Sequence, residues 1–362
     1  MKIKITNIST ICTWSPAEDK LLILSDVEIL VEDSTIIQIS KTVGGAEEEI
    51  DADGALITPG FVDSHTHPIF SGNRANEFSM RISGKSYEEI ASMGGGIISS
   101  INEVRNASEE QLLEECLERI NFFLVHGTTT IEAKSGYGLT IEDELKSLKV
   151  IKRLNESSPL DIIPTFMGAH AFPPEFKNDH GGYVRLICEE MIPVVAEEKL
   201  AEFCDVFCEN GYFSVEQSKR VLETGIKYGL KPRLHADEFL DSGAAELAAE
   251  IGAVSADHLM AVSDLGINSP ITLREIYDLL EKKNLQPIDP LIAINARFHY
   301  DEQPKGEWLR MAVPLDSMID SDGIPHLPKL GQGLNLLFLE TYWSYPGAIF
   351  HPHNDFVVQK KP

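Results

Sequence analysis

The order of apolar and polar positions changes once along the chain, near residue 57. Residues 1–57 carry short runs in which apolar and polar residues alternate, such as KIKI, KLLILSDVEILVE and TIIQIS, separated by Ser, Asp, Gly and Pro. Alternation with a period of two is typical of strands that have one buried face. The pattern therefore predicts a small layer of β-structure over residues 1–57.

Beyond this point apolar runs alternate with stretches of helical periodicity, which is the order of parallel βαβ units. Six runs predict strands, and each ends in Gly or polar residues: ALITPGFVDSH, TTTIEAKSG, LDIIPTFMGAH, AEFCDVFCENG, KPRLHADE and AVSADHL. Helix signals lie between them, as capping-box pairs at two starts and glycines at two ends: Ser108 with Gln111, Ser214 with Gln217, Gly127 and Gly229. Six units predict a (β/α)8 barrel, whose two remaining strands must come from residues 265–362, where PLIAINARF and GLNLLFLE are the candidates.

Length and charge restrict the partners. The 362 residues accommodate a barrel of about 250 residues and a smaller domain. A formal net charge of −26 excludes nucleic acid and anionic membrane surfaces as expected partners, because they repel such a chain. No apolar run approaches the roughly 20 residues of a membrane span, and the N-terminus lacks the apolar core of a signal peptide. We therefore expect a cytoplasmic protein.

The five cysteines predict reduced, buried thiols rather than a disulfide framework. Cys204 and Cys208, four residues apart in EFCDVFCEN, fall on one face of a predicted strand. Metal ligation is the alternative, but free cysteine is commonly a small core residue, and this is the interpretation we prefer.

The richest chemical signal is Gly60-Phe-Val-Asp-Ser-His65-Thr-His67. Alternate residues of a strand point to one face, so His65 and His67 can address a single point, as two imidazole ligands of a metal do. Two unrelated surface histidines are the alternative. His235 and His258 end the fifth and sixth predicted strands, and the strand ends of a barrel meet at one mouth. We therefore expect these histidines to form a metal site.

Imidazoles with a carboxylate suit zinc or ferrous iron, and water bound to such a metal loses a proton near pH 7 instead of about 15.7. Glu238 and His258 are the candidates for general acid and base. Lys134 could be a modified lysine that bridges two metals, but pairing with a carboxylate is the preferred interpretation. Asp63 and Asp257 either orient imidazoles or face solvent, and neither is assigned a role.

Three further residues lie on loops after predicted strands, where substrate contacts concentrate. Arg74 in FSGNRANEF offers a planar guanidinium that could clamp a carboxylate, a useful local cation in so acidic a chain. Tyr137 in KSGYGLT and His170 in MGAHAFPPE are the other two, and each taken singly is also compatible with an ordinary loop residue.

Several stretches together resemble the imidazolonepropionase family of the amidohydrolase superfamily: TPGFVDSHTHPIFSGNRANEF, MGGGI, HGTTTIEAKSGYGL, PTFMGAHAFPPE, EFCDVFCENGYFSVEQS, HADE and GAVSADHL. This resemblance extends from residue 1 to residue 263. It implies hydrolysis of 4-imidazolone-5-propanoate to N-formimidoyl-L-glutamate in histidine degradation, with one zinc or iron ion, Fe2+ or Fe3+, per chain. The partners it implies are a small anionic substrate and a second copy in a homodimer.

By the same resemblance each candidate residue receives a role: His65, His67 and His235 would bind the metal, Arg74, Tyr137 and His170 would hold the substrate, and Glu238 and His258 would be catalytic. The implied fold is α/β, a (β/α)8 TIM-like barrel with a small β-sandwich domain. Residues 1–57 would be the N-terminal part of the sandwich and residues 58–340 the barrel, divergent over 265–340. Residues 341–362 would be a tail or a return to the sandwich.

The sequence departs from the family beyond residue 263. The family has a metal-binding Asp at the eighth strand in a Thr-Asp-Phe-Asn-Pro-Gly-like stretch, and residues 265–362 contain no such stretch. Asp301 and Asp322 are the candidates to replace it, although neither lies in matching surroundings. His351 and His353 form a second His-x-His, which we assign to a surface loop. The alternatives are a catalytically defective homologue with an incomplete barrel, and an amidohydrolase or deaminase acting on another cyclic amide or heterocycle.

Overall fold

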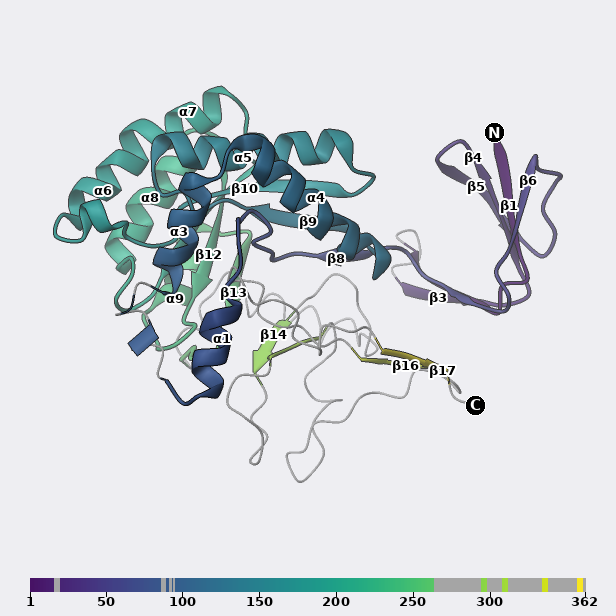
Figure 1. Ribbon diagram of the computed structural model, residues 1–362. Coiled ribbons are helices and arrows are strands. Elements are labelled where there is room, and N and C mark those ends of the chain that lie inside the picture. Colours follow the sequence, from purple (N-terminus) through teal and green to yellow (C-terminus); the bar gives the residue numbers. More distant parts are fainter. Residues whose placement is uncertain are drawn as a thin grey trace. The chain divides into compact units, whose positions relative to one another are not determined.

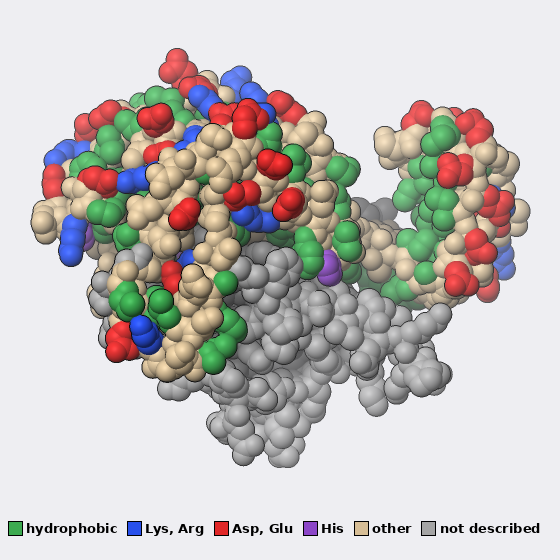
Figure 2. Space-filling model, in the orientation of Figure 1, with side chains coloured by type: hydrophobic (Ala, Val, Ile, Leu, Met, Phe, Trp, Pro, Cys, Tyr) green, Lys and Arg blue, Asp and Glu red, His purple; other side chains and the backbone are tan. Residues whose placement is uncertain are grey.

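The computed structural model describes residues 1–15, 20–85, 89–90, 93 and 95–263, together with the backbone of four short strands beyond them (Figure 1). These residues divide into two compact units, Met1–Phe61 and a second that begins at Val62. Asp and Glu side chains are spread over the face of both units that Figure 2 shows, as the formal net charge of −26 requires. No helix in the described ranges is long and apolar enough to cross a membrane.

The first unit consists of two small sheets, with strand orders β5-β4-β1-β6 and β3-β2-β7. Their bounds are β1 (Lys2–Thr6), β2 (Thr10–Ser15), β3 (Lys20–Leu24), β4 (Glu28–Glu32), β5 (Thr35–Ser40), β6 (Glu48–Asp51) and β7 (Leu56–Ile57). Ile8, Ile11 and Ile29 are its buried centre, and partly buried apolar residues of both sheets pack against them. KLLILSDVEILVE forms two strands instead of one, because Asp26 turns the chain with a φ of 55°.

The second unit is built on a six-stranded sheet of order β13-β12-β11-β10-β9-β8, in which β9 to β13 pair in parallel. Its strands are β8 (Phe61–Asp63), β9 (Thr128–Lys134), β10 (Asp161–Ala169), β11 (Phe203–Cys208), β12 (Lys231–Ala236) and β13 (Ser255–His258). Each lies within one of the six predicted runs. ALITPGFVDSH is divided between β7 and β8, because Pro59 and Gly60 interrupt the strand.

Helices connect these strands: α1 (Ala75–Ile82), α3 (Ile97–Asn106), α4 (Glu109–Val125), α5 (Ile141–Ser157), η1 (Pro174–Phe176), α6 (His180–Leu186), η2 (Ile187–Met191), α7 (Ile192–Glu197), α8 (Val215–Lys227) and α9 (Ala244–Ile251). α4 contacts β9, α5 contacts β10, α8 contacts β11 and α9 contacts β12 (Figure 1). The core lies between the two layers, where Ile131, Val206 and Leu234 of the sheet are fully buried with Leu148 and Leu222 of the helices.

Helix ends follow the predicted signals with one exception. Ser214 and Gln217 form the complete capping box at the start of α8. At the start of α4 the Ser108 hydroxyl accepts from the backbone N–H of Gln111, but the Gln111 side chain donates to Glu115 instead of closing the box. The two predicted terminal glycines follow α4 and α8 with left-handed φ values: Gly127 (83°) and Gly229 (87°).

The two runs predicted to supply the seventh and eighth strands do contain strands, β14 (Ile294–Arg297) and β16 (Leu334–Leu337). Each pairs antiparallel with a later strand, β15 (Trp308–Met311) or β17 (Val357–Lys360), and neither is part of the six-stranded sheet. Within the described residues the sheet therefore has six strands, and the two further strands of a full barrel stay a prediction. Asp301, Asp322, His351 and His353 lie outside the described residues.

Candidate metal centre

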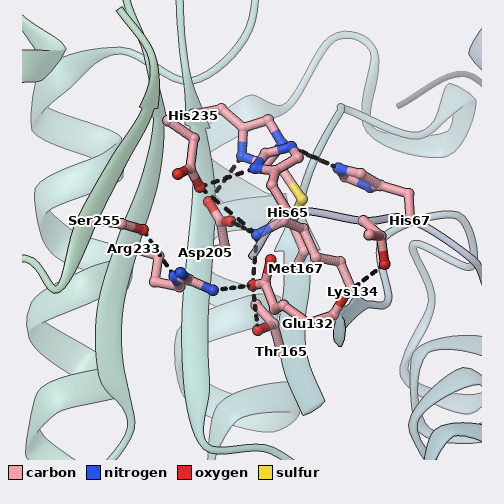
Figure 3. Close-up of polar contacts among 12 residues, drawn as sticks. His65, His67, Glu132, Lys134, Thr165, Met167, Asp205, Arg233, His235 and Ser255 are labelled. Carbon is pink, nitrogen blue, oxygen red and sulfur yellow. Dashed lines mark hydrogen bonds and ion pairs between the residues drawn. The ribbon is translucent and has the colours of Figure 1, made fainter. Parts of the chain in front are cut away.

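Three buried histidines lie together, His65 and His67 just beyond the end of β8 and His235 close to the end of β12 (Figure 3). The Nε2 atom of His67 lies 3.4 Å from Nε2 of His65 and 3.2 Å from Nε2 of His235. Thr66 lies between His65 and His67. Its hydroxyl donates to the backbone carbonyl of Glu132 at 2.5 Å, and its backbone carbonyl accepts the N–H of Lys134 at 3.2 Å. The segment that carries His65 and His67 is therefore tied to β9, and both imidazoles meet the one at the end of β12.

Carboxylates determine which nitrogen atoms are presented to this meeting point. His65 Nδ1 lies 2.9 Å from Oδ2 of Asp257, and His235 Nδ1 lies 3.0 Å from Oδ1 of Asp205. The carboxylate of Asp205 only accepts, so Nδ1 of His235 carries the proton and its Nε2 presents a lone pair, whereas Asp257 is an ion-pair contact of His65. Nε2 of His65 and Nε2 of His235 both face Nε2 of His67, which can donate at most one proton and so cannot donate to both. A cation bound among the three nitrogens would satisfy them together.

The distances fit a metal ion. Two nitrogens bound to one tetrahedral zinc at about 2.0–2.1 Å would stand about 3.3 Å apart, and the observed separations are 3.2 and 3.4 Å. Burial, followed by the charge of His170, lowers the pKa of His67 well below its ordinary value, which leaves this imidazole neutral. Another grouping is also compatible with a metal, because one nitrogen each of His65, His235 and His258 lie within 4.8 Å of one another.

His258 and Glu238 form a buried pair at the same place. His258 ends β13 with a φ of 78°, and its ring centroid is 4.9 Å from that of His65 and 5.0 Å from that of His235. Its Nε2 atom lies 3.6 Å from Oε2 of Glu238. Burial, with a smaller contribution from the charge of Glu209, raises the pKa of Glu238 to about 8. The pair can therefore hold a proton near neutral pH.

The structure also brings two of the predicted substrate residues to the histidines. The ring centroid of His170 lies 5.1 Å from that of His67, and that of Tyr137 lies 5.0 Å from His170. His170 Nδ1 donates to the carbonyl of Gly136 at 3.0 Å, which leaves Nε2 as an acceptor. Burial, with the charge of His235, lowers the pKa of His170 to about 3. Both side chains are buried, His170 with 6% exposure and Tyr137 with 1%.

Arg74, the third predicted substrate residue, is the N-cap of α1. Its guanidinium donates from Nε at 2.7 Å and from Nη2 at 2.5 Å to Oε2 of Glu77 in the first turn of that helix. The same Glu77 accepts the backbone N–H of Gly96 with its other oxygen at 3.1 Å. An internal carboxylate thus occupies the position that a substrate carboxylate was predicted to take.

A buried charged cluster beneath the histidines was only partly foreseen. Lys134 pairs with carboxylates, as preferred from the sequence, with Nζ 2.6 Å from Glu132 and 2.6 Å from Asp205. The sequence pattern does not predict the roles of Asp205, Glu132 and Arg233, nor the contact of Asp257 with His65. A signal existed, because a single charged residue inside an apolar strand such as FCDVFC is buried only when it is paired.

The cysteines behave as core residues. Cys204 and Cys208 are fully buried with free thiols, and burial raises the pKa of Cys208 to about 11. The remaining thiols, those of Cys12, Cys116 and Cys188, are also free. The interpretation of this pair as buried reduced thiols is confirmed.

Comparison with known proteins gives the family. No family model matches the sequence. The chain is 48% identical over 275 residues to an imidazolonepropionase of Shouchella clausii, covering 71% of this chain and 62% of that protein. It is 45% identical over 294 residues to an imidazolonepropionase of Clostridium tetani, covering 76% and 69%.

The chain spans less than two thirds of several such relatives, including 59% of the one from Thermoanaerobacter pseudethanolicus. A solved 5-methylcytosine deaminase from Klebsiella pneumoniae has a TM-score of 0.50 at 17% identity and covers 90% of this chain and 73% of its own. At that identity the likeness shows the fold alone, which is the amidohydrolase α/β fold with a parallel sheet. By sequence, the chain belongs to the imidazolonepropionase family.

Proposed function

We propose that this chain hydrolyses 4-imidazolone-5-propanoate to N-formimidoyl-L-glutamate at the centre formed by His65, His67 and His235. The observation that carries the proposal is that Nε2 of His67 lies within 3.4 Å of Nε2 of both His65 and His235, two buried imidazoles whose Nδ1 atoms lie beside Asp257 and Asp205. Identities of 45% to 54% with relatives named imidazolonepropionase support the substrate. Hydrolysis adds water to the ring carbonyl, breaks the bond from this carbon to the ring nitrogen, and places a proton on that nitrogen.

One zinc or iron ion, Fe2+ or Fe3+, per chain is the cofactor that we propose for this centre. His65, His67 and His235 would hold it, and His258 lies near enough to take part. A bound ion of this kind would supply Lewis-acid activation of water at neutral pH and polarise the carbonyl under attack. Three imidazoles with carboxylates behind two of them are the donor set that these metals accept.

Glu238 and His258 move the protons of the reaction. Oε2 of Glu238 and Nε2 of His258 are 3.6 Å apart, an ion-pair distance from which a small side-chain rotation would give a hydrogen bond. Both side chains are buried, with 5% and 6% exposure, so bulk water does not compete for the proton. One of them takes the proton of the attacking water, and the pair returns it to the leaving ring nitrogen.

Substrate contacts come from His170, Tyr137 and Arg74. His170 is held by Gly136 with its Nε2 free to accept from a ring N–H, and Tyr137 packs against the same imidazole. Arg74 is the cation that we assign to the propionate group, which would then exchange with Glu77 for the guanidinium. A ring without the propionate loses this exchange and is expected to be a poor substrate.

The architecture implied by the family forms part of the proposal. The six strands of the described sheet would be the first six of a (β/α)8 barrel over residues 58–340, and residues 1–57 would belong to a β-sandwich. Two sheets that share the apolar cluster of Ile8, Ile11 and Ile29 support the second assignment. Residues 341–362, the cytoplasmic location and the homodimer stay as predicted from the sequence.

The test is loss of the ring absorbance of freshly prepared 4-imidazolone-5-propanoate on incubation with the zinc- or iron-loaded chain. Turnover with the propionate ring, and little with the ring that lacks it, is the expected result. His126→Ala serves as a matched control for His65→Ala, because His126 ends α4 and bonds to the carbonyl of Phe122. Faster turnover of the ring without propionate would instead support an amidohydrolase of another cyclic amide.

A further inference from the structure

A single buried lysine connects both carboxylates that hold metal-site histidines. Nζ of Lys134 lies 2.6 Å from Oδ2 of Asp205 and 3.9 Å from Oδ2 of Asp257. Asp205 holds His235, and Asp257 holds His65. Figure 3 shows the ammonium group of Lys134 beside Asp205 and Glu132. We propose that Lys134 is a positioning residue of the metal centre, which fixes the orientation of His65 and His235 together.

The backbone of Lys134 serves the same centre. Its N–H donates to the carbonyl of Thr66, between His65 and His67, at 3.2 Å. The side chain is fully buried, so it cannot leave the cluster without moving β9. Through its side chain or its backbone, Lys134 therefore contacts a group that holds each of the three proposed ligand histidines.

The rest of the cluster keeps the ammonium in place. Glu132 accepts from Lys134 at 2.6 Å, from Nη1 of Arg233 at 2.6 Å and from the hydroxyl of Thr165 at 2.6 Å, all through Oε1. Arg233 is fixed in turn by Ser255, whose Oγ accepts from Nε at 2.8 Å. Side chains on β9, β10, β12 and β13 thus define the position of Lys134 from the side opposite the histidines.

If Lys134 acted only through its charge, replacing it would change metal affinity in the opposite direction from that expected of a positioning residue. Lys134 and Arg233 face three carboxylates, those of Glu132, Asp205 and Asp257, so the cluster carries one net negative charge. Replacing Lys134 by a neutral residue makes it more negative, and simple Coulomb attraction would then bind a metal cation more tightly. If Lys134 acts by positioning, the same replacement frees both carboxylates and weakens binding. Whether metal affinity rises or falls therefore distinguishes an effect of charge from an effect of positioning.

The experiment measures zinc affinity by competition with a chelator, using the full chain and variants whose folding is checked by circular dichroism. Lys134→Met is expected to raise the zinc dissociation constant about 10- to 100-fold, the usual effect of losing a residue that orients a ligand. Lys219→Met, which removes a surface lysine of α8 that pairs with Glu250, is the matched control and is expected to bind zinc as the parent does. The double variant E132Q/K134M keeps the net charge of the cluster, guards against misfolding of the single variant, and should bind as weakly as K134M.

This inference rests on the proposed metal centre, and the experiment distinguishes failure of the inference from failure of the centre. A parent chain that binds no zinc overturns both. Zinc binding by the parent that is unchanged or tighter in K134M and in the double variant overturns the role of Lys134 alone. Nitrogen-15 spectra of the metal-free parent give a test that needs no variant: His235 should carry its proton on Nδ1, and a proton on its Nε2 would contradict the bond to Asp205.

Discussion

Nδ1 of His235 donates to Oδ1 of Asp205 at 3.0 Å, and this bond leaves Nε2 of His235 facing Nε2 of His67 at 3.2 Å. The acceptor lies on β11 and the imidazole on the neighbouring strand β12, where Phe207 is the register partner of His235. Asp205 and His235 belong to adjacent strands of a parallel sheet, so the orientation of a metal-site histidine is built into the ladder itself. For His235, the sheet and not a loop determines the orientation of the imidazole.

Asp205→Asn is the direct test of this bond. An amide can donate as well as accept, so it no longer fixes the proton of His235 on Nδ1. We expect zinc affinity and turnover to fall about 10- to 100-fold. Chelator competition and the ring-absorbance assay measure the two effects. Asp161→Asn, on the exposed first residue of β10, is the matched control and should change neither; equal losses in both variants would show a general effect of charge.

His65→Ala is expected to abolish metal retention and activity together, because it removes both an Nε2 donor and the partner of Asp257. Metal content after dialysis and turnover are measured on the same sample. His126→Ala should retain both properties. A metal-free His65→Ala variant with full activity would show that the histidine cluster is not the catalytic centre.

Metal removal should lower thermal stability. A ligand that binds only the folded state adds about 2.7 kcal/mol at a concentration of 100 times its dissociation constant. We therefore expect the melting temperature to fall when zinc is removed with a chelator and to recover when zinc returns. In His65→Ala the chelator should have no effect. If neither chelator nor zinc changed the melting temperature of the parent chain, the proposed metal site would be contradicted.

The ion pair of Arg74 and Glu77 predicts opposite effects of two substitutions on KM. Arg74→Gln removes the cation for the propionate, and loss of a charge-assisted hydrogen bond should raise KM about 10- to 100-fold. Glu77→Gln keeps the acceptor for Gly96 but removes the competing charge, so KM should fall. Steady-state kinetics with the propionate ring measures both. An unchanged KM in Arg74→Gln would place the substrate carboxylate elsewhere.

Glu144 predicts a pH dependence of stability. Its Oε1 accepts the backbone N–H groups of Gly138 and Leu139, both at 2.9 Å, in the loop that carries Tyr137. Burial raises the pKa of Glu144 above its ordinary value of 4.5. An acid whose pKa is raised by folding contributes most stability below its unfolded pKa, and this contribution is lost as pH rises through the folded pKa.

Glu144→Gln cannot ionise, so its stability relative to the parent should improve between about pH 5 and about pH 8. Melting temperatures at the two pH values give the comparison. Glu142→Gln, on the exposed neighbouring position of the same helix, should show no such change. A relative stability of Glu144→Gln that declines with rising pH would mean that the buried carboxylate is stabilised as an anion.

The fold of residues 58–263 was predictable because apolar runs, capping serines and terminal glycines agree with one another. His65, His67, His235 and His258 could be expected to meet because parallel strands end at one edge. Asp205 could not be assigned to His235, because a charged residue in an apolar run reveals that it has a partner but not which one, 30 residues away. The ion pair of Arg74 with Glu77 could not be predicted either, because the sequence does not show which of several nearby acidic residues pairs with a loop arginine.

The strands within 294–360 show what the sequence pattern could not predict. The apolar runs of β14 and β16 predicted strands correctly, but their partners β15 and β17 were not predicted, and pairing depends on the connection and on a partner elsewhere in the chain. Register is specified only where one face is buried against a defined layer. The sequence pattern therefore predicted the elements and not their sheet.

The most direct test of the metal-dependent hydrolase is a titration of the metal-free chain with zinc while the ring absorbance of 4-imidazolone-5-propanoate is followed. The structure predicts no turnover without metal, a rate that rises in proportion to added zinc, and a plateau at about one zinc per chain, since one converging set of Nε2 atoms holds one ion. Turnover that is independent of zinc, or one bound zinc per chain with an unchanged ring absorbance, would contradict it.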